Sequence, residues 1–180
     1  MTESGYIIAL DQGTTGTTAV LVDGSGRPVW SVSQEIEQIY PQPGWVEHNP
    51  AELFESCVEV GQELLEEMEV HPRAVRAIGI TNQRETAIVW DRTTGEPVMN
   101  AIVWQCRRTA PLCQSMISRG LEPMVREKTG LPIDPYFSAT KFRWILDSIP
   151  DGQARAEAGE LACGTVDSWL VWQFTNGTVH

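Results

Sequence analysis

The sequence predicts an α/β or α+β fold in which a strand meander comes first and helices mixed with strands follow. Three segments near the N-terminus support this prediction, because residues 6–10, 17–22 and 28–38 are apolar or alternate in polarity. Short Gly-rich turns separate them, and strands joined by such turns pair antiparallel. At 180 residues the chain is long enough for one such domain but short for two.

A long helix is predicted from Asn49 to about Met68. Asn49 is a favourable N-cap, Pro50 suits the first helical position, and Glu52 stands three residues after the cap. Pro72 marks where the helix must have ended. The apolar residues that recur at helical spacing and predict one buried face are Leu53, Cys57, Val60, Leu64 and Met68.

Shorter elements are predicted in the rest of the chain. Ser138 and Thr165 are candidate N-caps, and Gly120 and Pro150 are candidate helix stops. Residues 175–180 resemble a helix end, an Asn-Gly turn and the start of a strand, so we expect the natural chain to continue. The expected strands are 75–80, 86–90 and 98–103, with a hairpin turn at 91–95, and the expected helices are about 109–119, 138–147 and 165–174.

Composition excludes several classes of protein. The net charge of −11 argues against a nucleic-acid or anionic-membrane surface, since both need basic patches. No apolar run approaches the ~20 residues that span a bilayer, and the N-terminus lacks the features of a signal peptide, so we expect a cytoplasmic protein. The four cysteines show no CxxC spacing and are expected to be reduced, and the three scattered histidines predict no zinc cluster.

The segment Asp11–Thr15 ends an apolar strand and turns directly into the next one. Glycine lets the backbone approach a ligand, amide and hydroxyl groups can donate to phosphate oxygens, and a carboxylate can hold Mg²⁺ through water. No GKS or GKT follows, so this is not a Walker-type loop. An ordinary hairpin turn with Asp11 capping its own backbone explains the residues equally well.

Polar or aromatic side chains also follow the strands that end near residues 80 and 103. Asn82–Glu85 offers donors and acceptors that suit polyol hydroxyls, although a surface Arg–Glu pair is the simpler interpretation. Trp104 can cover the carbon face of a polyol, and Arg107 and Arg108 add positive charge; a core tryptophan beside a solvated arginine pair is the alternative. Tyr136 offers a hydroxyl to a ligand or packs against the helix that follows it.

Each motif is weak alone, but their order along the chain resembles that of the FGGY carbohydrate kinases, and within them the glycerol kinases. Asn82–Glu85 and Trp104–Arg108 favour the glycerol kinases over the pentulose kinases, and Lys141 and Trp144 match the general kinase pattern of the family. The segments that carry the resemblance are 10–15, 40–48, 79–86, 100–109, 134–141 and 164–169.

The resemblance implies an actin-like, RNase H-like ATPase fold, with a mixed sheet flanked by helices, and a second domain that closes over a cleft. It implies that residues 1–180 are the N-terminal FGGY kinase domain, truncated before the ATP-binding domain. It also implies phosphoryl transfer from ATP to glycerol with Mg²⁺, in a homo-oligomer when full length. The catalytic base is expected beyond residue 180, so this chain alone should be inactive.

Site residues follow from the same resemblance, position by position. Asp11 is expected to hold Mg²⁺ through water. Thr18 departs from the family pattern, which usually has Arg there, and this puts phosphate affinity in question. The residues expected to bind glycerol are Arg84, Glu85, Trp104 and Tyr136, and those expected to face the ATP phosphates and Mg²⁺ are Asp11, Gly13, Thr14 and Thr15.

Two other functions stay open on the sequence. One is an FGGY kinase that acts on another polyol or sugar, which a substrate panel would distinguish. The other is a non-catalytic polyol-binding module, which would lack a downstream domain with a catalytic aspartate.

Overall fold

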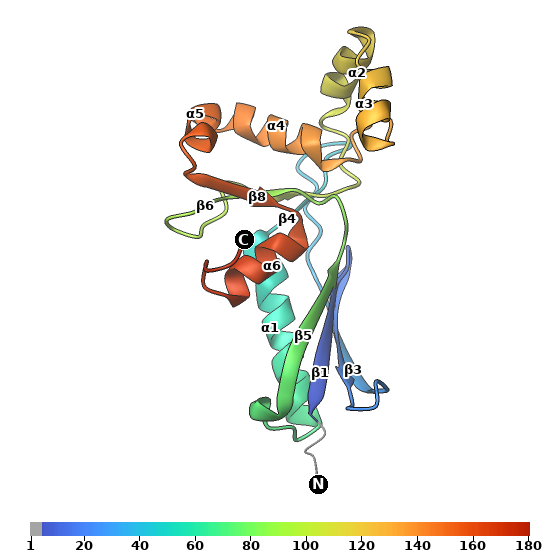
Figure 1. Cartoon of the computed structure of the whole chain (residues 1–180), viewed down its shortest axis with the longest axis vertical. Coiled ribbons are helices and arrows are strands. Elements are labelled where there is room, and N and C mark those ends of the chain that lie inside the picture. The colour runs from blue at the N-terminus through green and yellow to red at the C-terminus, as the bar shows by residue number, and fades with distance from the viewer. Residues whose placement is uncertain (1–4) are drawn as a thin grey trace. The chain divides into compact units, whose positions relative to one another are not determined.

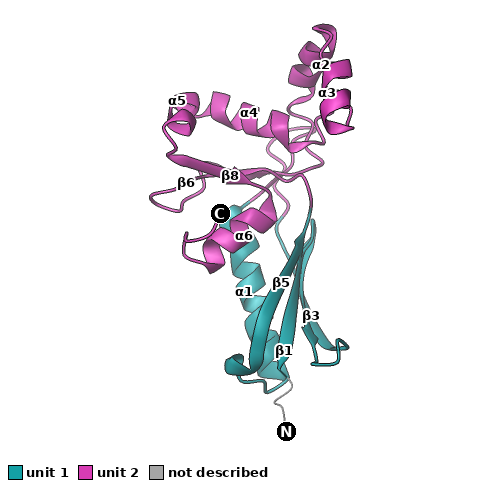
Figure 2. Cartoon of the chain, viewed as in Figure 1, with its two compact units in different colours: residues 1–37, 49–83 teal, residues 38–48, 84–180 magenta. Residues whose placement is uncertain are grey.

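The computed structural model describes residues 5–180 and divides the chain into two compact units (Figures 1 and 2). Unit 1 consists of the described residues up to Glu37 together with Asn49–Gln83. Unit 2 consists of Gln38–His48 and Arg84–His180. The chain therefore passes from one unit to the other at 37/38, 48/49 and 83/84.

Unit 1 is a four-stranded sheet covered by one long helix. The strands β1 (Tyr6–Gln12), β2 (Gly16–Val22) and β3 (Pro28–Glu35) form the predicted antiparallel meander, in which Leu10 pairs with Ala19. The strand β5 (Val75–Asn82) joins β1 in parallel, which gives the order β3-β2-β1-β5 and a mixed sheet. Thus the meander predicted from the short turns is confirmed.

The helix α1 (Pro50–Glu67) connects β3 to β5 and lies along one face of the sheet (Figure 1). Its cap is the predicted one, because the Asn49 side chain accepts a hydrogen bond from the Ala51 amide. Glu52 instead accepts from the Glu37 amide at 2.7 Å, which ties the helix start to the end of the meander. The core between helix and sheet contains Ile8, Leu10, Ala19, Leu21, Val32, Leu53, Cys57, Val60 and Leu64, whereas Met68 is half-buried.

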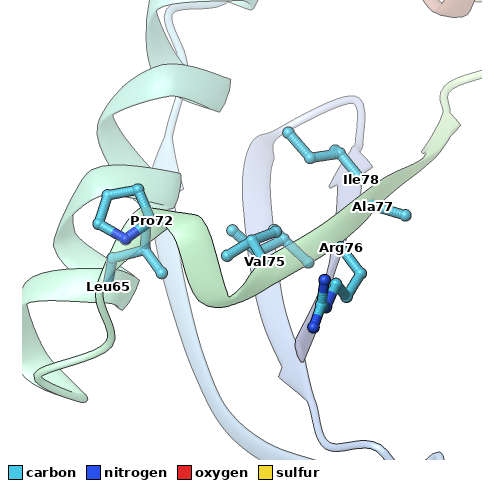
Figure 3. Close-up of a pocket in the computed structure, with 7 residues that line it drawn as sticks. Leu65, Pro72, Val75, Arg76, Ala77 and Ile78 are labelled. Atoms are coloured by element: carbon cyan, nitrogen blue, oxygen red, sulfur yellow. The ribbon is translucent and has the colours of Figure 1, made fainter. Parts of the chain in front are cut away.

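The opposite face of this sheet is exposed. Ile7 on β1 lies on this face and is 43% exposed. Ile78 pairs with Ile8 and therefore lies on the helix side of the sheet, where it is 49% exposed because β5 is an edge strand. Beside β5 lies an apolar groove of about 390 Å³, bordered by Leu65 of α1, by Pro72 of the 3₁₀ turn η1 (Pro72–Ala74), and by β5 (Figure 3). None of the predicted site residues lines this groove.

Unit 2 is built from two short antiparallel strand pairs and five helices. The strand β4 (Glu47–His48) pairs with β7 (Ala101–Ile102), and β6 (Ile88–Asp91) pairs with β8 (Leu161–Gly164). One buried cluster combines Val46, Ala87, Val89, Ile102, Val103, Cys106 and Ile145. The helices are α2 (Ala110–Ser118), α3 (Glu122–Thr129), α4 (Ser138–Ser148), α5 (Gly152–Glu157) and α6 (Val166–Phe174).

Several local predictions in unit 2 are wrong. The N-cap of α4 is Phe137 rather than Ser138, because the Ser138 hydroxyl donates to Glu85 instead of turning back on its helix. Thr165 is the N-cap residue of α6 as expected, although its hydroxyl donates to Asp167 and makes no cap hydrogen bond among the described residues. The expected strand 98–103 shrinks to β7, and residues 178–180 form no strand. Gly120 and Pro150 do follow the ends of α2 and α4 as expected.

Candidate functional site

The predicted phosphate turn lies at the end of β1 in unit 1. The Gly13 amide donates to the Gly16 carbonyl at 2.9 Å, and the Ile36 amide donates to the Thr15 carbonyl at 3.1 Å. Gly16 permits this tight turn, because a Cβ there would come within 2.6 Å of the Gln34 carbonyl oxygen on β3. The Gly13 amide, expected to be open to phosphate, is therefore already occupied within the turn.

Two buried glutamines brace the turn from beneath. Gln83 donates through Nε2 to Gln12 Oε1 at 3.0 Å and to the Gly13 carbonyl at 3.1 Å, while its backbone amide donates to the Gln12 carbonyl. Gln12 itself donates to the Gly13 carbonyl at 2.9 Å. Gln83, grouped on the sequence with the polyol residues, thus supports the phosphate turn instead. Sequence reasoning missed Gln12, whose one signal was a polar residue at a core-facing position of an apolar strand.

Asp11 lies on the exposed face of the same sheet, opposite the face that holds Leu10 and Gln12. Its register partners are Thr18 on β2 and Thr81 on β5, and the Thr18 hydroxyl hydrogen-bonds Ser33 on β3 at 2.8 Å. A polar row therefore crosses all four strands beside the turn. One carboxylate among hydroxyls offers a hard oxygen ligand with room for water, which suits Mg²⁺ bound mainly through water and phosphate.

In unit 2, Glu85 has an unusual backbone. Its φ is +65°, a left-handed conformation that costs a non-glycine residue about 1–2 kcal/mol. Its carboxylate oxygen Oε2 accepts hydrogen bonds from the Ser138 amide at 2.9 Å and the Ser138 hydroxyl at 2.6 Å. Non-glycine residues held in this conformation cluster at functional sites, where the surroundings over-determine them.

Aromatic rings complete a cluster with Glu85. Trp104 and Tyr136 meet edge to face, with ring centroids 5.9 Å apart, and Tyr136 also meets Phe137 at 5.1 Å. The Trp104 amide donates to the Thr86 hydroxyl at 3.2 Å, which joins the tryptophan to the residue after Glu85. Glu85, Trp104 and Tyr136 are all half-buried. The structure therefore brings these three predicted glycerol residues together, beside the start of α4.

The arginines of the predicted site are placed differently. Arg84 is exposed, and its guanidinium makes no hydrogen bond or ion pair with the described residues. Arg107 is exposed and lies 3.5 Å from Asp134. Arg108 is buried: its guanidinium is 2.7 Å from Glu47 and lies over the ring of Trp45, 3.9 Å from the centroid. The alternative of a solvated arginine pair is therefore wrong, because only Arg107 is exposed.

Burial lowers the pKa of two basic side chains in this unit. His48 is fully buried, with Nε2 3.0 Å from Gln38 Oε1, and burial lowers its pKa to about 4. Lys141 on α4 is fully buried as well, and burial lowers its pKa to about 8. Within residues 5–180, no three or more His, Cys, Asp or Glu side chains gather as metal ligands. No helix in this range is long and apolar enough to cross a bilayer.

A family model defines the class to which this fold and these residues belong. The N-terminal domain of the FGGY family of carbohydrate kinases matches residues 6–180. The chain belongs to this family. Its actin-like α/β fold agrees with solved sugar kinases, among them a gluconate kinase from Lactobacillus acidophilus with a TM-score of 0.79 at 25% identity, covering 93% of this chain and 32% of that one.

The more similar relatives carry one particular name. The chain is 58% identical over 175 residues to a glycerol kinase from Burkholderia cenocepacia, which covers 97% of this chain and 35% of the relative. The crystal structure of a Plasmodium falciparum glycerol kinase with ADP matches with a TM-score of 0.91 at 31% identity, covering 98% of this chain and 35% of that one. The chain thus spans about a third of the length of the proteins it matches.

Proposed function

We propose that the protein to which this chain belongs transfers the γ-phosphoryl group of ATP to glycerol, giving glycerol 3-phosphate and ADP. The observation that carries the proposal is the cluster of Glu85, Trp104 and Tyr136, held together beside the start of α4. The similarity to glycerol kinases along 97% of the chain supports it. The chain is then the N-terminal domain of a longer kinase, and it supplies most of the glycerol site.

Each member of the cluster has a chemical task in this proposal. Glu85 Oε2 is occupied by Ser138, whereas no described residue donates to Oε1, so Oε1 is the acceptor for a glycerol hydroxyl. The Trp104 and Tyr136 rings exclude water and cover the carbon backbone of the polyol. Arg84, whose guanidinium has no partner among the described residues, donates to the remaining hydroxyl oxygens.

The turn at Asp11, Gly13, Thr14 and Thr15 is proposed to face the ATP phosphates. Because the Gly13 amide is occupied, side-chain hydroxyl groups of the turn are proposed as the phosphate donors. Gly13 keeps the turn narrow, since a Cβ there would lie 3.1 Å from the Gly16 carbonyl oxygen. Asp11 would hold Mg²⁺ through water, and the ion would neutralise charge on the phosphates. Transfer of this kind depends mainly on positioning and charge stabilisation. We assign the proton-accepting carboxylate to the sequence that follows residue 180.

Location and assembly belong to the same proposal. All four cysteines are free in the structure, and three of them are buried. Free thiols are typical of a reducing compartment, which supports a cytoplasmic enzyme. We also propose that the complete protein is a homo-oligomer, which light scattering would test.

The test is a coupled kinase assay of the complete protein with glycerol, xylulose and gluconate as acceptors. Glu85→Gln should lower kcat/KM for glycerol about 10- to 100-fold, the range expected when a hydrogen bond to a charged acceptor weakens. Glu122→Gln, the same change on the exposed side of α3, is the matched control and should leave kcat/KM unaltered. A preference for xylulose or gluconate would refute the assignment of glycerol, and full activity in Glu85→Gln would refute the role of Glu85.

A further inference from the structure

Lys141 is a lysine without access to solvent. Its side chain is fully buried, although lysine is among the residues least often buried. The sequence has one other lysine, Lys128, which is exposed on α3. From the first turn of α4, the Lys141 ammonium reaches back and donates a hydrogen bond to the carbonyl oxygen of Tyr136. A buried cation therefore hydrogen-bonds the backbone of Tyr136, a residue assigned to the glycerol site.

Burial disfavours the charged form of Lys141, and neighbouring acidic groups offset this effect only in part. Burial lowers its pKa to about 8, against the opposing effects of Glu85, Cys106, Asp134 and Cys113. At neutral pH the side chain is still mostly protonated. No ion pair joins Lys141 to a carboxylate within the part of the chain that the structure describes. Replacing a buried charge by an apolar side chain of similar volume is often neutral or stabilising, so packing alone does not explain a lysine here.

The segment that Lys141 holds is fixed at several other points. The Tyr136 amide donates to Asp134 Oδ1 at 2.8 Å, and the Phe137 amide donates to the Asp134 carbonyl at 3.2 Å. The next residue, Ser138, donates twice to Glu85. With the Lys141 bond added, both backbone polar groups of Tyr136 are fixed, and so is the connection between Tyr136 and the carboxylate of Glu85.

We propose that Lys141 is a positioning residue for the substrate site, which sets the Tyr136 ring against the Glu85 carboxylate by clamping the Tyr136 carbonyl. The inference rests on the proposed function and extends it to a residue that touches no substrate. The left-handed backbone of Glu85 needs surroundings that over-determine it, and Ser138 can supply its two hydrogen bonds only if the segment before α4 stays in place. Lys141 keeps it there.

The first test reads the clamp without any substrate. Lys141→Met removes the donor and keeps an unbranched apolar side chain, and Lys128→Met is the same change at an exposed position of α3. We expect amide hydrogen exchange of residues 136–138 to rise about tenfold in Lys141→Met, the factor expected for loss of one hydrogen bond to a charged group. The thermal midpoint should be equal or higher, and Lys128→Met should match the wild type. Unchanged exchange at 136–138 would overturn the proposal.

The second test is kinetic and uses the complete protein. Lys141→Met should raise KM for glycerol about tenfold or more while KM for ATP stays within about twofold, because the clamp acts on the glycerol cluster alone. Equal rises in both KM values together with a lower thermal midpoint would reveal a general structural role and refute positioning. A wild-type protein that phosphorylates no glycerol would refute the proposed function instead, and the exchange experiment would still decide the role of Lys141.

Discussion

Substitutions that break the ion pair between Arg108 and Glu47 should be among those that lower the stability of unit 2 most. Both side chains are buried, at 0% and 9% exposure, and the Nη2–Oε1 distance is 2.7 Å. Glu47→Gln keeps the shape and can still accept from Asn100, but it leaves the guanidinium without an anion. Nη1 of Arg108 has no hydrogen-bond partner within residues 5–180, so the remaining support is the contact of Nε with Cys106 and the rings of Trp45 and Trp144.

Breaking a buried pair by removing one partner typically costs about 3–5 kcal/mol, a large part of the roughly 5–15 kcal/mol that stabilises a domain. We therefore expect Glu47→Gln to lower the free energy of unfolding by about 3–5 kcal/mol. In the double variant with Arg108→Met, we expect a loss smaller than the sum of the two single losses, because neither charge is left alone.

Urea unfolding followed by tryptophan fluorescence measures these differences, and Trp45 and Trp144 report on the site directly. Glu122→Gln is the control, since it alters an exposed pair 3.8 Å apart whose worth should stay below about 1 kcal/mol. If Glu47→Gln cost less than about 1 kcal/mol, or if the two single losses simply added, Arg108 would not depend on Glu47 and the reasoning would fail.

Three further predictions concern single residues. Burial lowers the pKa of His48 to about 4, so the unfolded chain takes up a proton at a higher pH than the folded chain does. The free energy of unfolding should therefore fall by about 3 kcal/mol as the pH drops from about 6.5 to 4. In acid unfolding curves, His48→Gln should reduce this loss of stability, and His71→Gln should not. Thr18→Arg, opposite Asp11 in the register, should lower KM for ATP or raise kcat in the complete protein, and no change in either would contradict a phosphate role for this position. Asn49→Ala should cost about 1 kcal/mol in urea unfolding through loss of the α1 cap; an unaltered midpoint would show that Glu52 and Pro50 suffice.

Local chemistry made much of unit 1 predictable. The Gly-rich turns, the alternating strands and the Asn49-Pro50 helix start each satisfy backbone groups with neighbours in sequence, so the meander and α1 follow from the residues themselves. In contrast, α3 and α5 are short and largely polar, so they lack the apolar residues at helical spacing from which a helix is predicted. The strand β8 depends on pairing with β6, seventy residues earlier in the chain, which periodicity cannot reveal.

The site shows the same division between local and long-range information. The residue types at Glu85, Trp104 and Tyr136 indicated a polyol cluster, but their proximity depends on Ser138, which local chemistry assigned to a helix cap. The sequence grouped Gln83 with its neighbours in the polyol segment, but its side chain hydrogen-bonds Gln12, 71 positions earlier. Arg107 is exposed and Arg108 is buried because Glu47 and two tryptophans surround only Arg108. Such partners are chosen by tertiary structure.

The chain passes between the two units three times, and this limits how the protein can be cut into separate fragments. Unit 2 borrows Gln38–His48 from the middle of unit 1, so neither unit is one uninterrupted stretch of sequence. A fragment that stops at Gln83 keeps β4 but discards β7 and Arg108, leaving Glu47 without its guanidinium; a fragment that starts at Arg84 keeps Arg108 but discards Glu47. Cuts at 48/49 and at 83/84 therefore separate the same buried pair, whereas a cut at 37/38 keeps the pair but removes β1, β2 and β3 from unit 1. A separable version of either unit requires rejoining the chain in a new order.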